Sequence, residues 1–131
     1  MSIMAVDPGR DKCGLAVLSG EGKVLWRQVV ETARLQEKAG ERAGEFGVSL
    51  LLLGNGTTSK SAEEKLREAL PHTELKVVEE YRTTEEAKKL YWQVNPPRGW
   101  RRLLPTSLQV PPEPVDDLVA VILARREIEK V

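Results

Sequence analysis

The sequence is poor in the residues that build disulfides and zinc sites, because it contains one cysteine and one histidine. A single cysteine excludes an intramolecular disulfide, and Cys13 stands in an apolar stretch where a free thiol usually packs as a small hydrophobic side chain. His72 follows Pro71 in an expected turn, with no second histidine or cysteine near it. We therefore expect neither a zinc site nor a histidine that acts as a general base.

Long apolar runs and an excess of one charge are also missing. The longest apolar run, Val48 to Leu53, contains one serine and is far shorter than the roughly 20 residues that span a bilayer. The N-terminus lacks a basic segment followed by an apolar one, so we expect a cytoplasmic protein with no membrane partner. Lysine plus arginine and aspartate plus glutamate both number 20, so any nucleic-acid site must come from local charge.

What the sequence does contain is an ordered alternation of apolar runs and turns over 131 residues, the size of a single domain. The expected strands are 3–7, 13–18, 23–30, 49–53 and 75–78; the expected helices run from 32 to 45, from 59 or 61 to 70, from 83 or 84 to 92, and from 116 to 129. Thr32 is the expected N-cap of the first helix and Gly47 its expected stop. This order predicts one α/β domain over residues 1–131, with a five-stranded mixed sheet in which an antiparallel meander precedes parallel strands, flanked by helices.

Acidic residues stand at the predicted ends of several elements. Asp7 ends the first strand, Glu79 and Glu80 follow the fifth, and Asp116 and Asp117 open the last helix. If the first, fourth and fifth strands are parallel, their carboxyl ends share one edge of the sheet. Converging carboxylates raise one another's pKa, and a bound divalent cation removes that cost; oxygen ligands favour Mg²⁺ or Mn²⁺ over zinc. The alternative is that these acids simply favour helix starts and solvent.

Two loops are candidate contacts for a nucleic acid. The first is glycine-rich and follows the fourth strand, where backbone N–H groups can receive a phosphate, although it equally suits a plain strand-to-helix turn. The second lies in the proline-rich stretch 94–114, where guanidinium groups can pair with phosphates and an indole can stack on a base. In the alternative, the indole packs beneath the loop and the arginines are only solvated. The candidate substrate-binding residues are Gly54, Asn55, Gly56, Thr57, Arg98, Trp100, Arg101 and Arg102.

Three segments together resemble the RuvC/YqgF-like branch of the ribonuclease H-like superfamily. Residues 5–17 are similar to the first strand and turn of that family, residues 79–87 to its second acidic segment, and residues 116–123 to its last helix. Residues 54–59 also resemble a loop in the YqgF-like domain of the transcription accessory protein Tex. Because these segments occur in the family's order along nearly the whole chain, the resemblance is more specific than any one motif.

The resemblance implies a ribonuclease H-like fold and a set of metal ligands. By that match Asp7, Glu80 and Asp116 are the catalytic residues, and they hold Mg²⁺ or Mn²⁺ with Asp117 or Glu79 as an auxiliary ligand. The sequence departs from the YqgF pattern at Glu79, where an aspartate is usual, and at Tyr81, where an arginine is expected.

The function that the resemblance implies is a metal-dependent nuclease of the YqgF type, which cuts either a ribosomal RNA precursor or a branched DNA such as a Holliday junction. RNA and branched DNA are therefore both candidate partners, and cutting a symmetric junction would call for a homodimer. The alternative is a nucleic-acid-binding module that keeps the fold but cuts weakly or not at all, as in Tex-like proteins. An actin-like phosphotransferase also begins with Asp-x-Gly, but it needs a second domain for which 131 residues leave no room.

Overall fold

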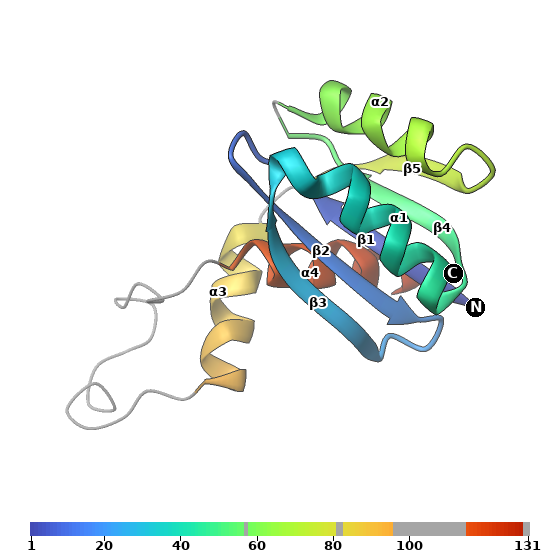
Figure 1. Cartoon of the computed structure of the whole chain (residues 1–131). Helices are drawn as coiled ribbons and strands as arrows, with labels where there is room; N and C mark the ends of the chain where they lie inside the picture. The colour runs from blue at the N-terminus through green and yellow to red at the C-terminus, as the bar shows by residue number, and fades with distance from the viewer. Residues whose placement is uncertain (57, 81–82, 96–114, 130–131) are drawn as a thin grey trace, which may run out of the picture.

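The computed structural model describes residues 1–56, 58–80, 83–95 and 115–129, and Figure 1 shows a central sheet with helices on both faces. The strands are β1 (Ser2–Asp7), β2 (Lys12–Ser19), β3 (Val24–Glu31), β4 (Val48–Gly54) and β5 (Glu74–Val78). The helices are the short 3-10 helix η1 (Thr32–Arg34), α1 (Leu35–Phe46), α2 (Ser59–Ala69), α3 (Thr83–Val94) and α4 (Asp116–Glu129). Among the described segments, no helix has the length and apolar character needed to cross a membrane.

The strand order is β3-β2-β1-β4-β5, which confirms the predicted mixed sheet. β1 pairs antiparallel with β2, and β2 pairs antiparallel with β3, so the first three strands form the expected meander. β4 lies parallel to β1 and β5 lies parallel to β4. The carboxyl ends of β1, β4 and β5 therefore share one edge of the sheet. In open α/β sheets, ligands bind at this edge.

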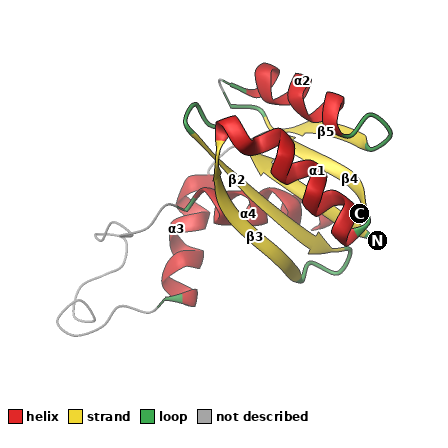
Figure 2. Cartoon of the chain, in the orientation of Figure 1, coloured by secondary structure: helices red, strands yellow, loops and turns green. Residues whose placement is uncertain are grey.

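Each face of the sheet carries its own hydrophobic core, because successive strand residues point to opposite faces. On β1, Met4 and Val6 belong to the core under α1 and α2, whereas Ile3 and Ala5 belong to the core under α3 and α4. Figure 2 shows the two helical layers on opposite sides of the strands. β4 contributes leucines to both cores, which explains why its sequence is a continuous apolar run.

The last helix, α4, packs across β1 and β2 and beside α3. Two side chains in the C-terminal part of α4 make further contacts. The Arg126 side chain forms a 3.1 Å ion pair with Glu86 of α3, and Arg125 Nε donates a 3.3 Å hydrogen bond to the carbonyl oxygen of Gly22. α4 begins at Asp116 as predicted, so the position of that residue is set by a helix with anchors along its length.

The start of the first helix differs from the prediction. Thr32 was expected to cap a helix that begins there, but it is the first residue of η1, and α1 begins only at Leu35. The Thr32 hydroxyl instead donates to the carbonyl oxygen of Gly9, at 2.8 Å, because the β1–β2 turn lies within its reach. The expected stop is confirmed, since Gly47 ends α1 in the left-handed region at φ 61°.

Candidate metal centre at the carboxyl edge of the sheet

Asp7 is the last residue of β1, and the turn that follows it is held from two sides. A Cβ atom on Gly9 would lie 2.1 Å from the carbonyl oxygen of Lys12, so only glycine fits this turn. From the start of η1, Thr32 donates its hydroxyl to Gly9 O and its backbone N–H to Asp11 O, at 2.8 and 2.9 Å. These bonds fix the chain direction at the point where the Asp7 side chain leaves the strand.

Glu80 follows β5 and lies over the end of β4. The Asn55 side-chain oxygen accepts a 3.2 Å hydrogen bond from Glu80 N, and Asn55 N donates to Val78 O at 2.9 Å. A Cβ atom on Gly54 would meet Glu80 Oε1 at 2.0 Å, and one on Gly56 would meet Glu80 Oε2 at 3.1 Å. The glycines of this loop therefore make room for a carboxylate, a role that the sequence pattern did not indicate.

Asp116 reaches the same edge from α4. Gly14 lies directly opposite Asp7 in the β1–β2 pairing. A Cβ atom on Gly14 would stand 1.8 Å from Asp116 O and 2.6 Å from Asp117 N, so the first turn of α4 rests on bare backbone. Sequence reasoning missed Gly14; its one signal was a glycine inside an apolar strand, which often marks such a close approach.

Asp7 is affected by both other carboxyl groups. Burial raises the pKa of Asp7 to about 9, helped by the hydrogen bond that the protonated Asp7 carboxyl group donates to the Glu80 carboxylate and by the negative charges of Glu80 and Asp116. Burial also raises the pKa of Asp116, as does the neighbouring charge of Asp117, while Lys12 lowers it. Asp7 therefore lies close to the Glu80 carboxyl group and within reach of the Asp116 charge, so a compensating positive charge would favour its ionised form.

One carboxylate oxygen at this edge has no hydrogen-bond donor among the residues that the structure describes. Glu80 Oε1 is buried, and no donor N–H or hydroxyl in the described ranges reaches it. A buried carboxylate oxygen without a partner is costly, and either a proton shared with Asp7 or a cation would satisfy it. Oxygen-only ligands with this much negative charge suit Mg²⁺ or Mn²⁺.

The ligands are not already arranged as a finished metal site. Within the described residues, no group of three His, Cys, Asp or Glu side chains has the geometry to hold a metal ion. Asp7, Glu80 and Asp116 nevertheless supply the charge and the oxygen donors that suit a divalent cation, including the unpaired Glu80 oxygen. Their side chains would have to rearrange to coordinate one.

The two auxiliary ligand candidates lie in different surroundings. Asp117 is buried, with 7% of its surface exposed, and its Oδ2 forms a 2.7 Å ion pair with Arg27 Nη1 on β3. Its Oδ1 accepts a 3.0 Å hydrogen bond from Leu118 N. Glu79 is exposed to solvent.

Several candidate substrate contacts lie outside the described residues. These are Thr57, Arg98, Trp100, Arg101 and Arg102. Of the rest of the glycine-rich loop, Asn55 is exposed, while Gly54 and Gly56 border Glu80. Lys12 is an exposed cation close enough to Asp116 to lower its pKa, although the sequence did not mark it as a site residue.

Comparison with known proteins gives a family and a fold. Residues 1–91 match the family model described as the Tex protein YqgF-like domain. The structure is similar to that of Thermus thermophilus RuvC, with a TM-score of 0.66 and 17% identity, covering 95% of this chain and 90% of RuvC. A structure of T. thermophilus RuvC in complex with Holliday junction substrate matches over the same shares, with a TM-score of 0.62 and 15% identity. No curated protein matches the chain significantly. The predicted ribonuclease H-like fold of the RuvC type is confirmed.

Proposed function

This chain belongs to the family of Tex protein YqgF-like domains, and from that membership we propose that it is a nucleic-acid-binding domain whose binding edge holds a divalent cation. The observation that carries the proposal is the contact of Asp7, at the end of β1, with Glu80, after β5, where one buried Glu80 oxygen lacks a donor among the described residues and the charge of Asp116 on α4 acts on Asp7. A phosphate backbone approaching this edge would be repelled by the bare acids. A bound cation would turn the same edge into an attractive one.

Asp7, Glu80 and Asp116 are the residues that would hold the cation, with Mg²⁺ or Mn²⁺ as the ion. Glu80 offers the unpaired Oε1, and Asp7 must give up its proton before it can serve as a ligand. Because protons and cations compete for these oxygens, the affinity for the cation should rise with pH. Asp117 is the weaker candidate, since Arg27 already compensates its charge.

A second candidate function is hydrolysis of a phosphodiester, which would make the domain a nuclease. The observation that favours it is that each of the three positions keeps an acid and that the three acids converge on one edge. When bound, Mg²⁺ or Mn²⁺ would supply an activated water and stabilise the leaving oxygen. The three acids would hold the ion, and Lys12, which lies near Asp116, would bind a phosphate.

The class of nucleic acid is also a proposal. A structural neighbour binds a Holliday junction, and the family resemblance adds ribosomal RNA precursors, so branched DNA and RNA are both candidates. We assign the remaining backbone contacts to Arg98, Arg101 and Arg102, with Trp100 as a stacking platform. Two-fold action on a junction would require a homodimer.

The test measures binding and cutting together. Fluorescence anisotropy with a labelled four-way junction, duplex DNA and single-stranded RNA is recorded at constant ionic strength, with Mg²⁺ or with EDTA. Gel assays with Mg²⁺ or Mn²⁺ follow cleavage. Asp7→Asn removes a proposed ligand. Asp11→Asn is the matched control, because it makes the same substitution at an exposed acid in the turn after Asp7.

We expect Mg²⁺ to tighten binding of at least one substrate about tenfold or more, a gain of roughly 1.4 kcal/mol. Asp7→Asn should lose that gain, and Asp11→Asn should keep it. Cutting that needs the metal and disappears only in Asp7→Asn would establish the nuclease. Equal binding by all three proteins with and without Mg²⁺ would contradict the proposed cation site.

A further inference from the structure

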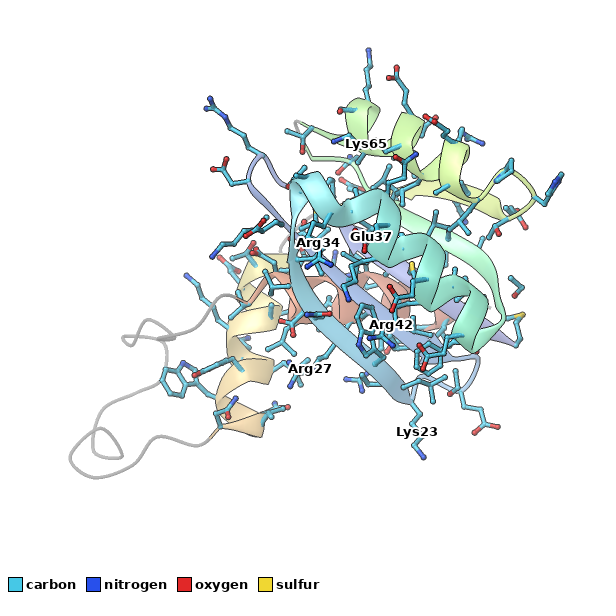
Figure 3. All side chains as sticks on the ribbon, in the orientation of Figure 1. Lys23, Arg27, Arg34, Glu37, Arg42 and Lys65 are labelled. Atoms are coloured by element: carbon cyan, nitrogen blue, oxygen red, sulfur yellow. The ribbon has the colours of Figure 1, made fainter. Side chains whose placement is uncertain are left out.

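A partly buried ion pair joins the edge strand β3 to the first turn of α4. Arg27 lies on β3 opposite Ala16 of β2, and its side chain, labelled in Figure 3, reaches Asp117. The Arg27 side chain is 37% exposed and that of Asp117 is 10% exposed, so the carboxylate is the buried partner. With Arg27 at 2.7 Å on one oxygen and Leu118 N at 3.0 Å on the other, both oxygens of Asp117 are engaged.

This pair lies next to the proposed cation site. Asp117 directly follows Asp116, and the backbone between them lies on Gly14, the residue opposite Asp7. A rotation of the first turn of α4 would therefore exchange the carboxylate that faces Asp7. The pair with Arg27 opposes that rotation, because it would have to break a short ion pair and leave Asp117 buried without a cation.

We propose that Arg27 is a positioning residue for the cation site: by binding Asp117 it keeps that carboxylate out of the site and leaves Asp116 alone to face Asp7 and Glu80. This inference rests on the proposed function, because it concerns the same cation. It also explains the paired acids at the start of α4. One is the ligand, and the other anchors the helix.

Removing Arg27 should act on the cation and not only on folding. In Arg27→Met, the buried Asp117 has no counter-charge and must either take up a proton or turn toward the nearest cation. Partners that orient metal ligands typically change metal affinity by about 10–100-fold when they are removed. Asp117→Asn keeps an oxygen for Arg27 and removes the negative charge that raises the pKa of Asp116.

The experiment titrates the full chain with Mn²⁺ alone, by calorimetry and by electron paramagnetic resonance, well below the unfolding temperature of each variant. We expect Arg27→Met to bind Mn²⁺ at least about tenfold more weakly, or with an altered resonance spectrum. Asp117→Asn should bind within about twofold of the unchanged chain. The double variant Arg27→Met with Asp117→Asn should recover most of the affinity, because the uncompensated carboxylate is gone. If Arg27→Met alone does not fold, the double variant tests the proposal in its place.

Two results would overturn the positioning role. One is an Arg27→Met chain that folds and binds Mn²⁺ with the affinity and the spectrum of the unchanged chain, or a double variant that does not recover the affinity. The other is an Asp117→Asn loss as large as that of Asp116→Asn, which would make Asp117 a ligand. Asp7→Asn separates the two levels of the proposal. If Asp7→Asn binds Mn²⁺ as well as the unchanged chain, the proposed cation site itself fails, whereas loss in Asp7→Asn without loss in Arg27→Met refutes only the role of Arg27.

Discussion

Gly54→Ala should separate the cation site from the stability of the fold. The added Cβ would stand 2.0 Å from Glu80 Oε1, 2.6 Å from Cδ and 2.8 Å from Cγ, so the carboxyl group cannot stay where it lies. All three atoms belong to the end of a flexible side chain, which can swing toward solvent. Gly54 is not among the glycines with positive φ, so alanine fits its backbone.

The magnitudes follow from that geometry. Overpacking a core position costs about 1–3 kcal/mol, and the freedom of Glu80 should keep the loss of unfolding free energy near the lower limit. The affinity for Mn²⁺ should fall at least about tenfold, because one of three carboxylates leaves the site.

Calorimetric titration with Mn²⁺ and urea unfolding followed by circular dichroism measure the two effects. Gly40→Ala is the control: an added Cβ there meets nothing within 4 Å, and it should stabilise α1 by about 0.5–1 kcal/mol with unchanged Mn²⁺ affinity. Unchanged Mn²⁺ affinity in Gly54→Ala would refute the assignment of Glu80 as a ligand.

Three further substitutions test the surroundings of the site. Gly14→Ala should lower the free energy of unfolding by about 1–3 kcal/mol or more, because its Cβ would meet the Asp116 backbone at 1.8 Å and neither strand nor helix can yield cheaply; urea titration with an unchanged midpoint would contradict this contact. In the metal-free chain, the raised pKa of Asp7, about 9 against an ordinary 3.8, means that its contribution to stability is complete below the ordinary value and is lost as pH rises through 9. Asp7→Asn should therefore become more stable than the unchanged chain as pH rises, by at least about 1 kcal/mol at pH 8, and parallel pH profiles of the unfolding midpoint would argue against it. Thr32→Val should cost about 1–2 kcal/mol by removing the hydroxyl that donates to Gly9 O, with weaker Mn²⁺ binding as the turn after Asp7 loosens; a loss of stability without any change in binding would limit Thr32 to a structural role.

The strands and the last helix could be predicted from the sequence, because local patterns of apolar and turn residues indicate them. Apolar alternation and turn residues located all five strands, and Asp116 opened the last helix where it was expected. The family resemblance is confirmed by the match of residues 1–91, a range that includes Asp7 and Glu80 but not Asp116.

The features that escaped prediction all depend on contacts between distant segments. Gly14 could not be distinguished from an ordinary strand residue, because the Asp116 backbone that it contacts stands about a hundred positions later in the chain. Thr32 has the chemistry of an N-cap, but a carbonyl group 23 residues earlier takes its hydroxyl hydrogen bond. Arg27 and Asp117, 90 residues apart, gave no signal of pairing in the sequence. In each case the local pattern was consistent with several environments, and packing selected one of them.

The central claim is that Asp7, Glu80 and Asp116 share one divalent cation. The most direct measurement is a pH titration of the side-chain carboxyl carbons by nuclear magnetic resonance, without divalent cations and then with Mg²⁺. Without Mg²⁺, the pKa of Asp7 should lie far above its ordinary value, near 9, and with saturating Mg²⁺ it should fall below neutrality while the carboxyl signals of all three residues shift together. An Asp7 that titrates near 4 in both conditions, with no response of the three carboxyl groups to Mg²⁺, would contradict the claim.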